Sequence, residues 1–429
     1  MRLRSFEVRG FKNLTQPVRL EGLGPINVIH GPNNVGKSNL LQAMQLFFHL
    51  VGIQLGVRLP FPEIGAVAVN VALRGIGLDP ADIFNFEKTV PIILVAEIET
   101  NAEELVRAGI ESELFHQVLI EMELQRDGEP VRYQLRHFIL ADGSDVRATP
   151  LEGAQLHLLS RFASFLSQNP LFRAQIPDRF AKVGIERLTA PDLALKLYDA
   201  KESADLEQVR RWERFLDAMS SFKSILGEGL FVATYDRKES KANLFYQTSF
   251  ARIPLRLLGS GVQQIVSLIG ELLMTHATLV AIEEPELNLR YTLQERLRDV
   301  FSQKVVGAEG GPSQLFLTSH SPAFEAGPHF YLMEPTPAGP KVSAHKVEQA
   351  RAAVGFPEDV VPPGLDAARC YLSTEGVVRV PEHIRQSLGL PNGGGVMFLE
   401  REGHVEMMSD ERFAAMLEAD EGDKGDEQA

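Results

Sequence analysis

Hydrophobic and polar positions follow two periods along the chain, and each period predicts one kind of element. Alternation at every second residue, or a short apolar run that ends in a glycine-rich turn, predicts a strand; apolar positions three and four apart predict a helix. The expected strands are residues 5–9, 25–30, 90–99, 118–124, 131–140, 278–283 and 314–318. The expected helices are residues 38–50, 262–274 and 290–303.

Residues 153–226 have a mainly helical pattern. One predicted helical face carries Leu206, Val209, Trp212, Phe215, Leu216 and Met219. We interpret this segment as a packed helical insertion with Trp212 in its core. The alternation of helices and strands that follows it is typical of an α/β fold with a largely parallel sheet.

The composition is that of a folded protein with an acidic excess. Of 429 residues, 44% are hydrophobic and 23% are charged, and 57 acidic against 43 basic residues give a formal net charge of −14. These values exclude a disordered chain, a collagen-like fibre and a uniformly basic nucleic-acid wrapper. The single cysteine, Cys370, excludes a disulfide framework within the chain and a cysteine-rich zinc site.

The charges are unevenly distributed. Residues 375–429 hold 13 acidic and five basic residues, whereas the first 20 residues hold five basic residues and one acid. A local basic face is therefore compatible with the negative net charge of the whole chain, and the charge does not exclude duplex DNA as a partner. The longest uncharged run, residues 38–57, is long enough for a membrane span, but it contains several amides and begins inside a phosphate-binding motif. We expect a cytoplasmic protein without a membrane partner.

Residues 31–38, GPNNVGKS, match the phosphate-binding motif G-x-x-x-x-G-K-[ST]. Glycines let the backbone curl so that its N–H groups face the phosphates, and the following helix presents its positive N-terminus to them. Lys37 is expected to reach the β- and γ-phosphates of ATP, and the Ser38 hydroxyl to join the Mg²⁺ shell. The expected nucleotide-binding residues here are Gly31, Pro32, Asn33, Asn34, Val35, Gly36, Lys37, Ser38 and Asn39.

A pair of acids ends the predicted strand 278–283. Glu283 and Glu284 come at its carboxyl end, which is the edge where open α/β sheets bind ligands. One carboxylate can support Mg²⁺, and the next can orient and deprotonate an attacking water. After a phosphate-binding loop, this pair indicates a catalytic role.

Two further segments flank this strand. Residues 258–264, LGSGVQQ, form a Gly/Ser turn that opens a helix, which is another anion-binding geometry. Residues 316–322, FLTSHSP, end a strand with His320. A lone histidine is more often structural, but beside a phosphate site it can hydrogen-bond the γ-phosphate or the attacking water.

The order of these four motifs resembles the ATP-binding-cassette type ATPase heads of the SMC, RecF and OLD superfamily. The opening MRLRSFEVRGFKNL and the segment INVIHGPNNVGKSNLLQAM look like that family's N-terminus. EEPELNL is similar to the Walker B motif of OLD-like ATPases, and LTSHSP to their switch histidine. The resemblance covers residues 1–50 and 250–335.

This resemblance implies a homodimer that hydrolyses ATP to ADP and phosphate between two heads. Glu284 would be the catalytic base, Glu283 would support Mg²⁺, and His320 would sense the γ-phosphate. Ser260 and Gly261 would act in trans on the nucleotide of the partner. The chain departs from the family pattern at Glu283, where many relatives have Asp, and at Ser260, which is shifted by one position in the signature.

Two features common in relatives are missing. The stretch of about 220 residues between the phosphate loop and the signature lacks long heptads, which excludes a coiled-coil arm like that of SMC proteins. OLD nucleases carry a Toprim domain with an Asp-x-Asp pair, and no such pair follows Ser321. We therefore do not expect this chain to cut DNA.

Residues 376–398 resemble the AbrB/MazE swapped-hairpin family, whose pattern is G-x-x-x-h-P-x-x-h-R-x-x-L-G-h-x-x-G-x-x-h-x-h, with h apolar. They predict a strand, a short helical turn and another strand. A single hairpin cannot bury its apolar face alone, so we expect pairing with a second chain. Residues 376–403 carry three Arg and three Glu, which favours dimerisation over DNA binding, although an ordinary appendage stays open.

These patterns predict six segments and one leading function. The function is an ATPase that dimerises around ATP and Mg²⁺ and regulates a partner effector or a DNA transaction, in prokaryotic DNA repair or antiviral defence as the resemblance implies. The alternatives are an ATP-responsive DNA-binding regulator of the antitoxin type and a structural clamp on DNA ends. The segments are an N-terminal lobe (1–150), a helical insertion (151–230), a C-terminal lobe (231–350), a linker (351–374), an AbrB-like hairpin (375–410) and an acidic tail (411–429).

Overall fold

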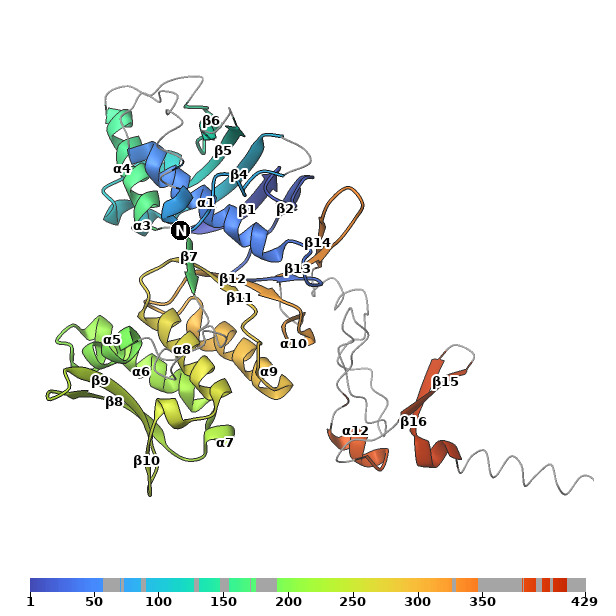
Figure 1. Cartoon of the computed structure of the whole chain (residues 1–429). Helices are drawn as coiled ribbons and strands as arrows, with labels where there is room; N and C mark the ends of the chain where they lie inside the picture. Colours follow the sequence, from blue (N-terminus) through green and yellow to red (C-terminus); the bar gives the residue numbers. More distant parts are fainter. Residues whose placement is uncertain are drawn as a thin grey trace, which may run out of the picture. The chain divides into compact units, whose positions relative to one another are not determined.

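The chain divides into two compact units, Met1–Ala352 and Ala353–Ala429. The first unit holds two large sheets with their helices, and the second holds a small hairpin (Figure 1). No helix in the described part of the chain has both the length and the apolar character needed to cross a membrane. The computed structural model describes residues 1–56, 70, 73–85, 90–126, 131–146, 154–169, 171–174, 191–325, 329–345, 380, 382–390, 396–401 and 404–414.

One sheet of the first unit is antiparallel, with five strands in the order β2-β1-β4-β5-β6. Its strands follow the period-two pattern, and β4 alternates buried and half-buried side chains along its whole length. The bounds are β1 Arg2–Arg9, β2 Val18–Leu20, β4 Ile92–Glu99, β5 Gln117–Arg126 and β6 Val131–Ile139. Between β4 and β5 lie the short helix α3 (Ala102–Arg107) and one turn of 3-10 helix, η1 (Glu113–Phe115).

The central sheet has six strands in the order β14-β13-β3-β12-β11-β7. All neighbours are parallel except the edge pair β13 and β14. Every residue of β3 and of β12 is buried, as expected of strands covered on both faces. The bounds are β3 Ile26–His30, β7 Leu171–Ala174, β11 Leu279–Glu283, β12 Gln314–Ser319, β13 His329–Glu334 and β14 Lys341–His345.

Helix α1 (Lys37–Gly56) lies between these two sheets. It contacts β1 of the antiparallel sheet and β7 and β12 of the central sheet, and it packs along α4 (Ala154–Gln168) (Figure 1). The ring of Phe47 meets that of Phe6 edge-on, with centroids 6.0 Å apart. A helix covered on several sides must be apolar nearly all round, which explains the uncharged run that begins at Ser38.

A second hydrophobic core covers the other face of the central sheet. Along β3, Ile29 belongs to the core with α1, whereas Val28 belongs to the core formed with α5, α6 and α8. A three-stranded antiparallel sheet, β10-β9-β8, adds Phe231 and Tyr246 to this second core. The bounds are α5 Pro191–Glu202, α6 Leu206–Ser220, α7 Lys223–Leu226, β8 Leu230–Asp236, β9 Lys241–Gln247, β10 Arg252–Pro254, η3 Leu255–Leu257, α8 Ser260–Met274, α9 Tyr291–Val300, the π-helical turn η4 Phe301–Val305 and α10 Pro322–Glu325.

The predicted strands and helices of the first unit are confirmed, with additions. Strand β7 was not predicted, because its four residues lie inside the segment expected to be mainly helical and are too few to show a period. Trp212 is 7% exposed on α6, as predicted, and its ring stacks on Phe215. Leu206 was expected on the same buried face but is 72% exposed, because it is the first residue of α6 and lies beyond the packed turns.

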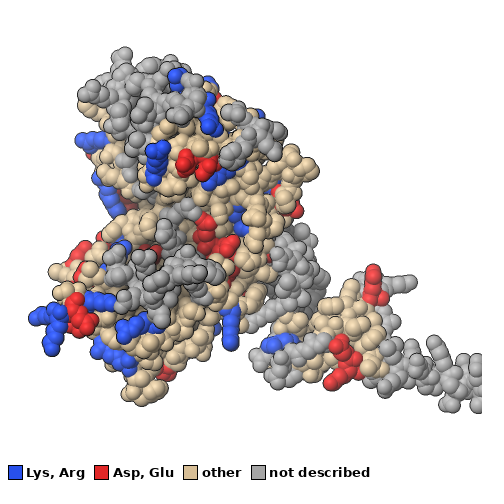
Figure 2. Space-filling view, viewed as in Figure 1, with Lys and Arg blue, Asp and Glu red and all other residues tan. Residues whose placement is uncertain are grey.

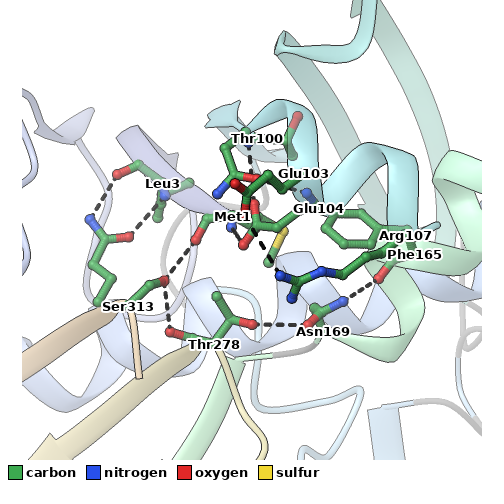
Figure 3. A network of polar contacts seen from close by, with 12 residues as sticks. Met1, Leu3, Thr100, Glu103, Glu104, Arg107, Phe165, Asn169, Thr278 and Ser313 are labelled. Carbon is green, nitrogen blue, oxygen red and sulfur yellow. Dashed lines mark hydrogen bonds and ion pairs between the residues drawn. The ribbon is translucent and has the colours of Figure 1, made fainter. Parts of the chain in front are cut away.

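A polar network joins the two sheets where their strands begin (Figure 3). The Ser313 hydroxyl lies 2.8 Å from the Met1 carbonyl and 3.1 Å from that of Thr278, and the Thr278 hydroxyl donates to Asn169 at 2.9 Å. The side chain of Gln314, which is fully buried, accepts from the Leu3 N–H and donates to the Leu3 and Gly24 carbonyls.

A cavity of about 530 Å³ opens beside this network. The polar side chains that line it already bond within the protein; Arg161, for instance, donates to the Gly109 carbonyl at 2.7 Å. We therefore assign no ligand to this cavity. Its lining residues are Glu104, Arg107, Ala108, Arg161, Ser164, Phe165, Gln168, Asn169 and Thr278.

The second unit contains a short helix and a two-stranded antiparallel hairpin. These elements are α12 (Glu382–Ser387), β15 (Val396–Arg401) and β16 (His404–Ser409). The strand expected at residues 376–380 lies outside the described residues except for Val380. Strand β15 pairs with β16, which lies after residues 376–398, the segment that the AbrB-like pattern covers.

Replacing Gln314 by leucine tests the join between the two sheets. Gln314→Leu leaves one buried N–H and two buried carbonyls without this partner, and we expect the free energy of unfolding to fall by about 2–5 kcal/mol. Urea unfolding followed by circular dichroism measures the change. Gln247→Leu, at an exposed position of β9, is the matched control and should move the midpoint little; equal midpoints for the two variants would contradict the role given to Gln314.

Candidate nucleotide site

The ends of three neighbouring strands bring the predicted motifs together. In the parallel register, Ser319 of β12 lies beside His30 of β3, and Thr318 lies beside Glu283 of β11. The phosphate-binding loop, His320 and Glu284 therefore follow these strands at one edge of the sheet. This is the edge where open α/β sheets bind ligands.

The phosphate-binding loop has the backbone that its glycines were expected to allow. Gly31 and Gly36 have backbone φ angles of 155° and 112°, which residues other than glycine rarely adopt. A Cβ on Gly31 would also lie 2.3 Å from the Met333 carbonyl oxygen. Asn34 adopts a left-handed conformation with φ of 63°, which asparagine tolerates better than most residues. Val35 is buried, while Pro32, Asn33 and Asn34 are exposed.

Lys37 is 6% exposed, and its ammonium points back into this loop. Nζ donates to the carbonyl oxygens of Gly31 at 2.6 Å and Pro32 at 2.9 Å. Burial lowers the pKa of the Lys37 ammonium, and the charges of Glu284 and Glu286 oppose this shift. Its hydrogen-bond partners are neutral, so a phosphate anion would compensate the buried charge better than they do. The loop thus fits a nucleotide phosphate.

Asn13 supports the loop from outside and was not predicted. Its amide accepts a hydrogen bond from Asn39 at 2.8 Å and donates to the Val35 carbonyl at 3.2 Å. The same side chain lies against Gly36, where a Cβ would come within 2.8 Å of it. Asn39, expected to bind nucleotide, therefore contacts Asn13. Asn13 carries no motif in the sequence, because its contacts run to backbone and to an amide 26 positions away.

Ser38 and Glu283 meet. The Ser38 hydroxyl donates to Oε2 of Glu283 at 2.5 Å, which joins the start of α1 to the end of β11. A hydroxyl and a carboxylate oxygen are ligands that Mg²⁺ prefers, and this ion takes few protein ligands when phosphates and water supply the rest. Within the described residues, no group of three or more His, Cys, Asp or Glu is arranged to hold a metal, so any Mg²⁺ here would depend on nucleotide phosphates.

Glu284 has a strained backbone at the end of β11. Its φ is 47°, a left-handed value that is uncommon for glutamate, and its N–H donates to the Thr318 carbonyl at 2.9 Å. This bond continues the ladder between β11 and β12 for one residue and turns the chain away from the sheet. Strain of this kind is typical of functional sites.

His320 is bound to a residue that was not predicted to have a role. Its backbone N–H donates at 2.9 Å to Oε1 of Glu286, which also accepts from the Ser319 hydroxyl at 2.7 Å. The His320 side chain is 43% exposed, whereas that of Glu286 is 3% exposed. Glu286 is visible in the sequence as part of EEPE, but only the three-dimensional contact shows what it holds.

Ser260 and Gly261 are the first residues of α8. Ser260 is exposed and, in the described part of the chain, makes no hydrogen bond to the phosphate-binding loop. Gly261 packs against the loop that follows β11: a Cβ there would lie 3.2 Å from the Leu289 side chain. Gln264, one turn further on, donates to the Pro285 carbonyl at 3.0 Å. The start of α8 is therefore attached to the segment that carries the two glutamates.

A comparison with protein families matches residues 26–324 to a family described as "AAA domain, putative AbiEii toxin, Type IV TA system". The chain belongs to this family. The match runs from the first residue of β3 to beyond His320, so it spans the phosphate-binding loop and the acidic pair. No curated protein matches this AAA-domain chain.

Solved SMC heads resemble the AAA-domain chain in fold. A crystal structure of an SMC head bound to the C-winged helix domain of ScpA shares 13% identity, with a TM-score of 0.52 over 82% of this chain and 100% of that one. The SMC head domain from Thermotoga maritima shares 16% identity, with a TM-score of 0.42 over 81% and 100% of the two chains. Sequence identities this low show a similar fold and nothing more, and the fold similarity rests on the first of these structures. The chain thus has an α/β P-loop fold similar to that of SMC heads, which confirms the predicted α/β P-loop fold class.

Removing the buried ammonium tests the nucleotide site. Lys37→Met should weaken ATP binding roughly 10- to 150-fold, because a charge-assisted hydrogen bond contributes about 1.5–3 kcal/mol. Isothermal titration calorimetry with a non-hydrolysable ATP analogue measures the affinity. Lys196→Met, which removes an exposed lysine on α5, is the control; wild-type affinity in Lys37→Met would show that this loop does not bind the phosphates.

Proposed function

We propose that this AAA-domain chain hydrolyses ATP at the edge formed by β3, β11 and β12, with Glu284 as general base. The observation that carries the proposal is the 2.5 Å contact between the Ser38 hydroxyl and Glu283. It joins the phosphate-binding segment to the acidic strand end, so that Glu284 follows within one residue. An acidic strand end far from the loop would support binding alone.

Each residue has a distinct part in the proposed reaction. The loop N–H groups and Lys37 bind the phosphates. Ser38 and Glu283 would hold Mg²⁺, which would supply positive charge against the phosphate oxygens. Glu284 orients the attacking water and takes its proton, while His320, beside the γ-phosphate, accepts a hydrogen bond from the same water. The products are ADP and phosphate.

We also propose that two heads close on ATP, with Ser260 and Gly261 contacting the nucleotide of the partner. Ser260 is exposed, and the N-terminus of α8 has no side-chain cap, so its backbone N–H groups suit an anion. The packing of Gly261 against Leu289, together with the bond from Gln264 to Pro285, would transmit such a contact to the same head's catalytic loop.

The C-terminal hairpin is proposed to hold the two protomers together. Phe398 of β15 and Val405 of β16 are 60% and 62% exposed, and Met397 is 37% exposed. Two strands cannot bury such side chains by themselves, and a two-stranded hairpin is at best marginally stable in water. A second copy of the hairpin would cover them. The exposed apolar side chains of the hairpin are what supports pairing with a second chain.

The regulated target is proposed to be a partner protein rather than DNA. Arg4 and Arg19, two of the five basic residues among the first 20, lie 3.2 Å from Glu99 and 2.9 Å from Glu21, so part of the N-terminal positive charge is already paired. On the side of the molecule in Figure 2, the described acidic and basic side chains are interspersed. The similar SMC head is bound to a domain of ScpA, and the family description names a toxin, which supports a protein partner. We propose a role in antiviral defence or DNA repair on the motif resemblance alone.

Hydrolysis is tested by Glu284→Gln. The amide cannot take a proton from water, so kcat should fall about 10²- to 10⁴-fold while ATP still binds. Phosphate release under steady-state conditions gives the rate, and calorimetry gives the affinity. Glu271→Gln, at a half-buried carboxylate on α8, is the control. A Glu284→Gln enzyme that turns over at the wild-type rate refutes the assignment.

The hairpin interface is tested by Phe398→Glu combined with Val405→Glu. Two carboxylates facing each other across the proposed interface should convert a nucleotide-independent dimer to a monomer, as measured by light scattering after gel filtration. Val106→Glu, at a position of α3 that is 60% exposed, is the matched control and should leave the mass unchanged. A wild-type protein that is monomeric without ATP would rule out this interface.

A further inference from the structure

Glu286 is a buried carboxylate that, within the described residues, accepts hydrogen bonds only from the short segment Ser319–His320. It is 3% exposed, and its Oε1 accepts from the Ser319 hydroxyl and from the N–H of His320. Burying a carboxylate is costly unless charge or hydrogen bonds compensate it. Two neutral donors on one oxygen are a small compensation. A residue needed only to brace the loop could have been an amide, so the negative charge itself requires an explanation.

Two further polar atoms at this contact have no hydrogen-bond partner among the described residues. Oε1 of Glu286 lies 3.4 Å from Nδ1 of His320, which is within ion-pair range but does not form a hydrogen bond. Nδ1 of His320 and Oε2 of Glu286 are both buried, and neither has a hydrogen-bond partner among the residues that the structure describes. Polar atoms of this kind are rare, and here they belong to two side chains already in contact. A small rotation of the imidazole would satisfy Nδ1.

The segment around His320 is held by further hydrogen bonds to the loop that carries Glu286. Gln294 accepts from the Ser321 hydroxyl at 2.5 Å and donates to the Leu289 carbonyl at 2.8 Å, so the residue after His320 is tied to the same loop. The charge of Glu286 also acts on the ammonium of Lys37, whose pKa it helps to raise against the effect of burial. Glu286 is therefore electrostatically coupled to the phosphate-binding loop and in contact with His320.

We propose that Glu286 is the positioning residue for His320, holding a hydrogen on Nδ1 so that Nε2, on the far side of the ring, can accept a hydrogen bond from the water that attacks the γ-phosphate. This inference rests on the proposed function, because it gives His320 its place beside the γ-phosphate. Glu286 acts through His320 and does not touch the reacting atoms. Hydrogen bonds at catalytic sites are often long without substrate and shorten when it binds, which fits the 3.4 Å separation.

The state of His320 can be measured without any turnover. The chain has 11 histidines, and the signals of His320 in a spectrum of protein labelled with ¹⁵N at histidine are those lost in His320→Gln. At pH 8.5, well above the ordinary histidine pKa of about 6.5, the proposal expects the ¹⁵N shift of a protonated Nδ1 in the wild-type protein. A wild-type His320 that carries its hydrogen on Nε2 alone overturns the proposal, whether or not the chain hydrolyses ATP.

Glu286→Gln supplies the second test. The amide oxygen can still accept from Ser319 and from the His320 N–H, while the charge is lost and the second carboxylate oxygen becomes an NH₂ donor. We expect the Nδ1 signal to move toward that of an unprotonated nitrogen, and kcat to fall about 10- to 100-fold while KM for ATP changes less than threefold. Glu123→Gln, which alters a carboxylate that is 6% exposed in β5, is the matched control and should change neither quantity.

A double mutant separates positioning from an independent effect. If Glu286 acts through His320, adding Glu286→Gln to His320→Gln lowers kcat no further than His320→Gln alone. If the two losses multiply, Glu286 acts on its own and the proposal fails. A wild-type protein without ATPase activity would contradict the proposed function but would leave the ¹⁵N measurement able to confirm or overturn the pairing of Glu286 with His320.

Discussion

The parallel pairing of β3 with β12, and of β12 with β11, is the constraint on which the rest of the structure depends. All residues of β3 and β12 are buried. Neighbouring apolar side chains along each strand belong to different hydrophobic cores, one on each face of the sheet. Because parallel strands end at the same edge, three loops from distant parts of the chain emerge side by side. The loop after β3 is rich in glycine, and those after β11 and β12 carry acids and a histidine. Chemistry at this edge follows from the register, and the register follows from the burial of both faces.

A shell of hydrogen bonds holds these loops at fixed positions. Asn13 supports the phosphate-binding loop, Glu286 and Gln294 hold the segment around His320, and Gln264 attaches α8 to the acidic loop. Most of these bonds run to backbone groups. The side chains proposed to face the nucleotide are thereby left with neutral or incomplete partners: Lys37 has two carbonyls, and the imidazole of His320 has a carboxylate at 3.4 Å. A site of this kind is organised before its ligand arrives.

The elements and the outline of the site could be predicted from the sequence because both depend on local patterns. The loop GPNNVGKS, the acids after an apolar run and the histidine at a strand end each occupy a few consecutive residues. The supporting residues could not be predicted, because Asn13 and Glu286 act on segments 22 and 34 positions away and no period marks them. Strand β7 escaped because four residues, LFRA, show no period, and Leu206 was misplaced because a helical face says nothing about where the packed turns begin.

The central sheet also sets when the chain can fold during its synthesis. Asn27 of β3 donates to the carbonyl of Leu315 in β12, 288 positions later. At about 5–20 residues per second, a ribosome needs roughly 14 to 58 s to make the intervening chain. During that time β3 lacks its parallel neighbour β12. The apolar surface of α1 that contacts β12 in the folded protein is likewise uncovered until β12 has been synthesised. The same long-range pairing that assembles the nucleotide edge leaves the nascent chain exposed to aggregation, and therefore dependent on whatever shields it in the cell.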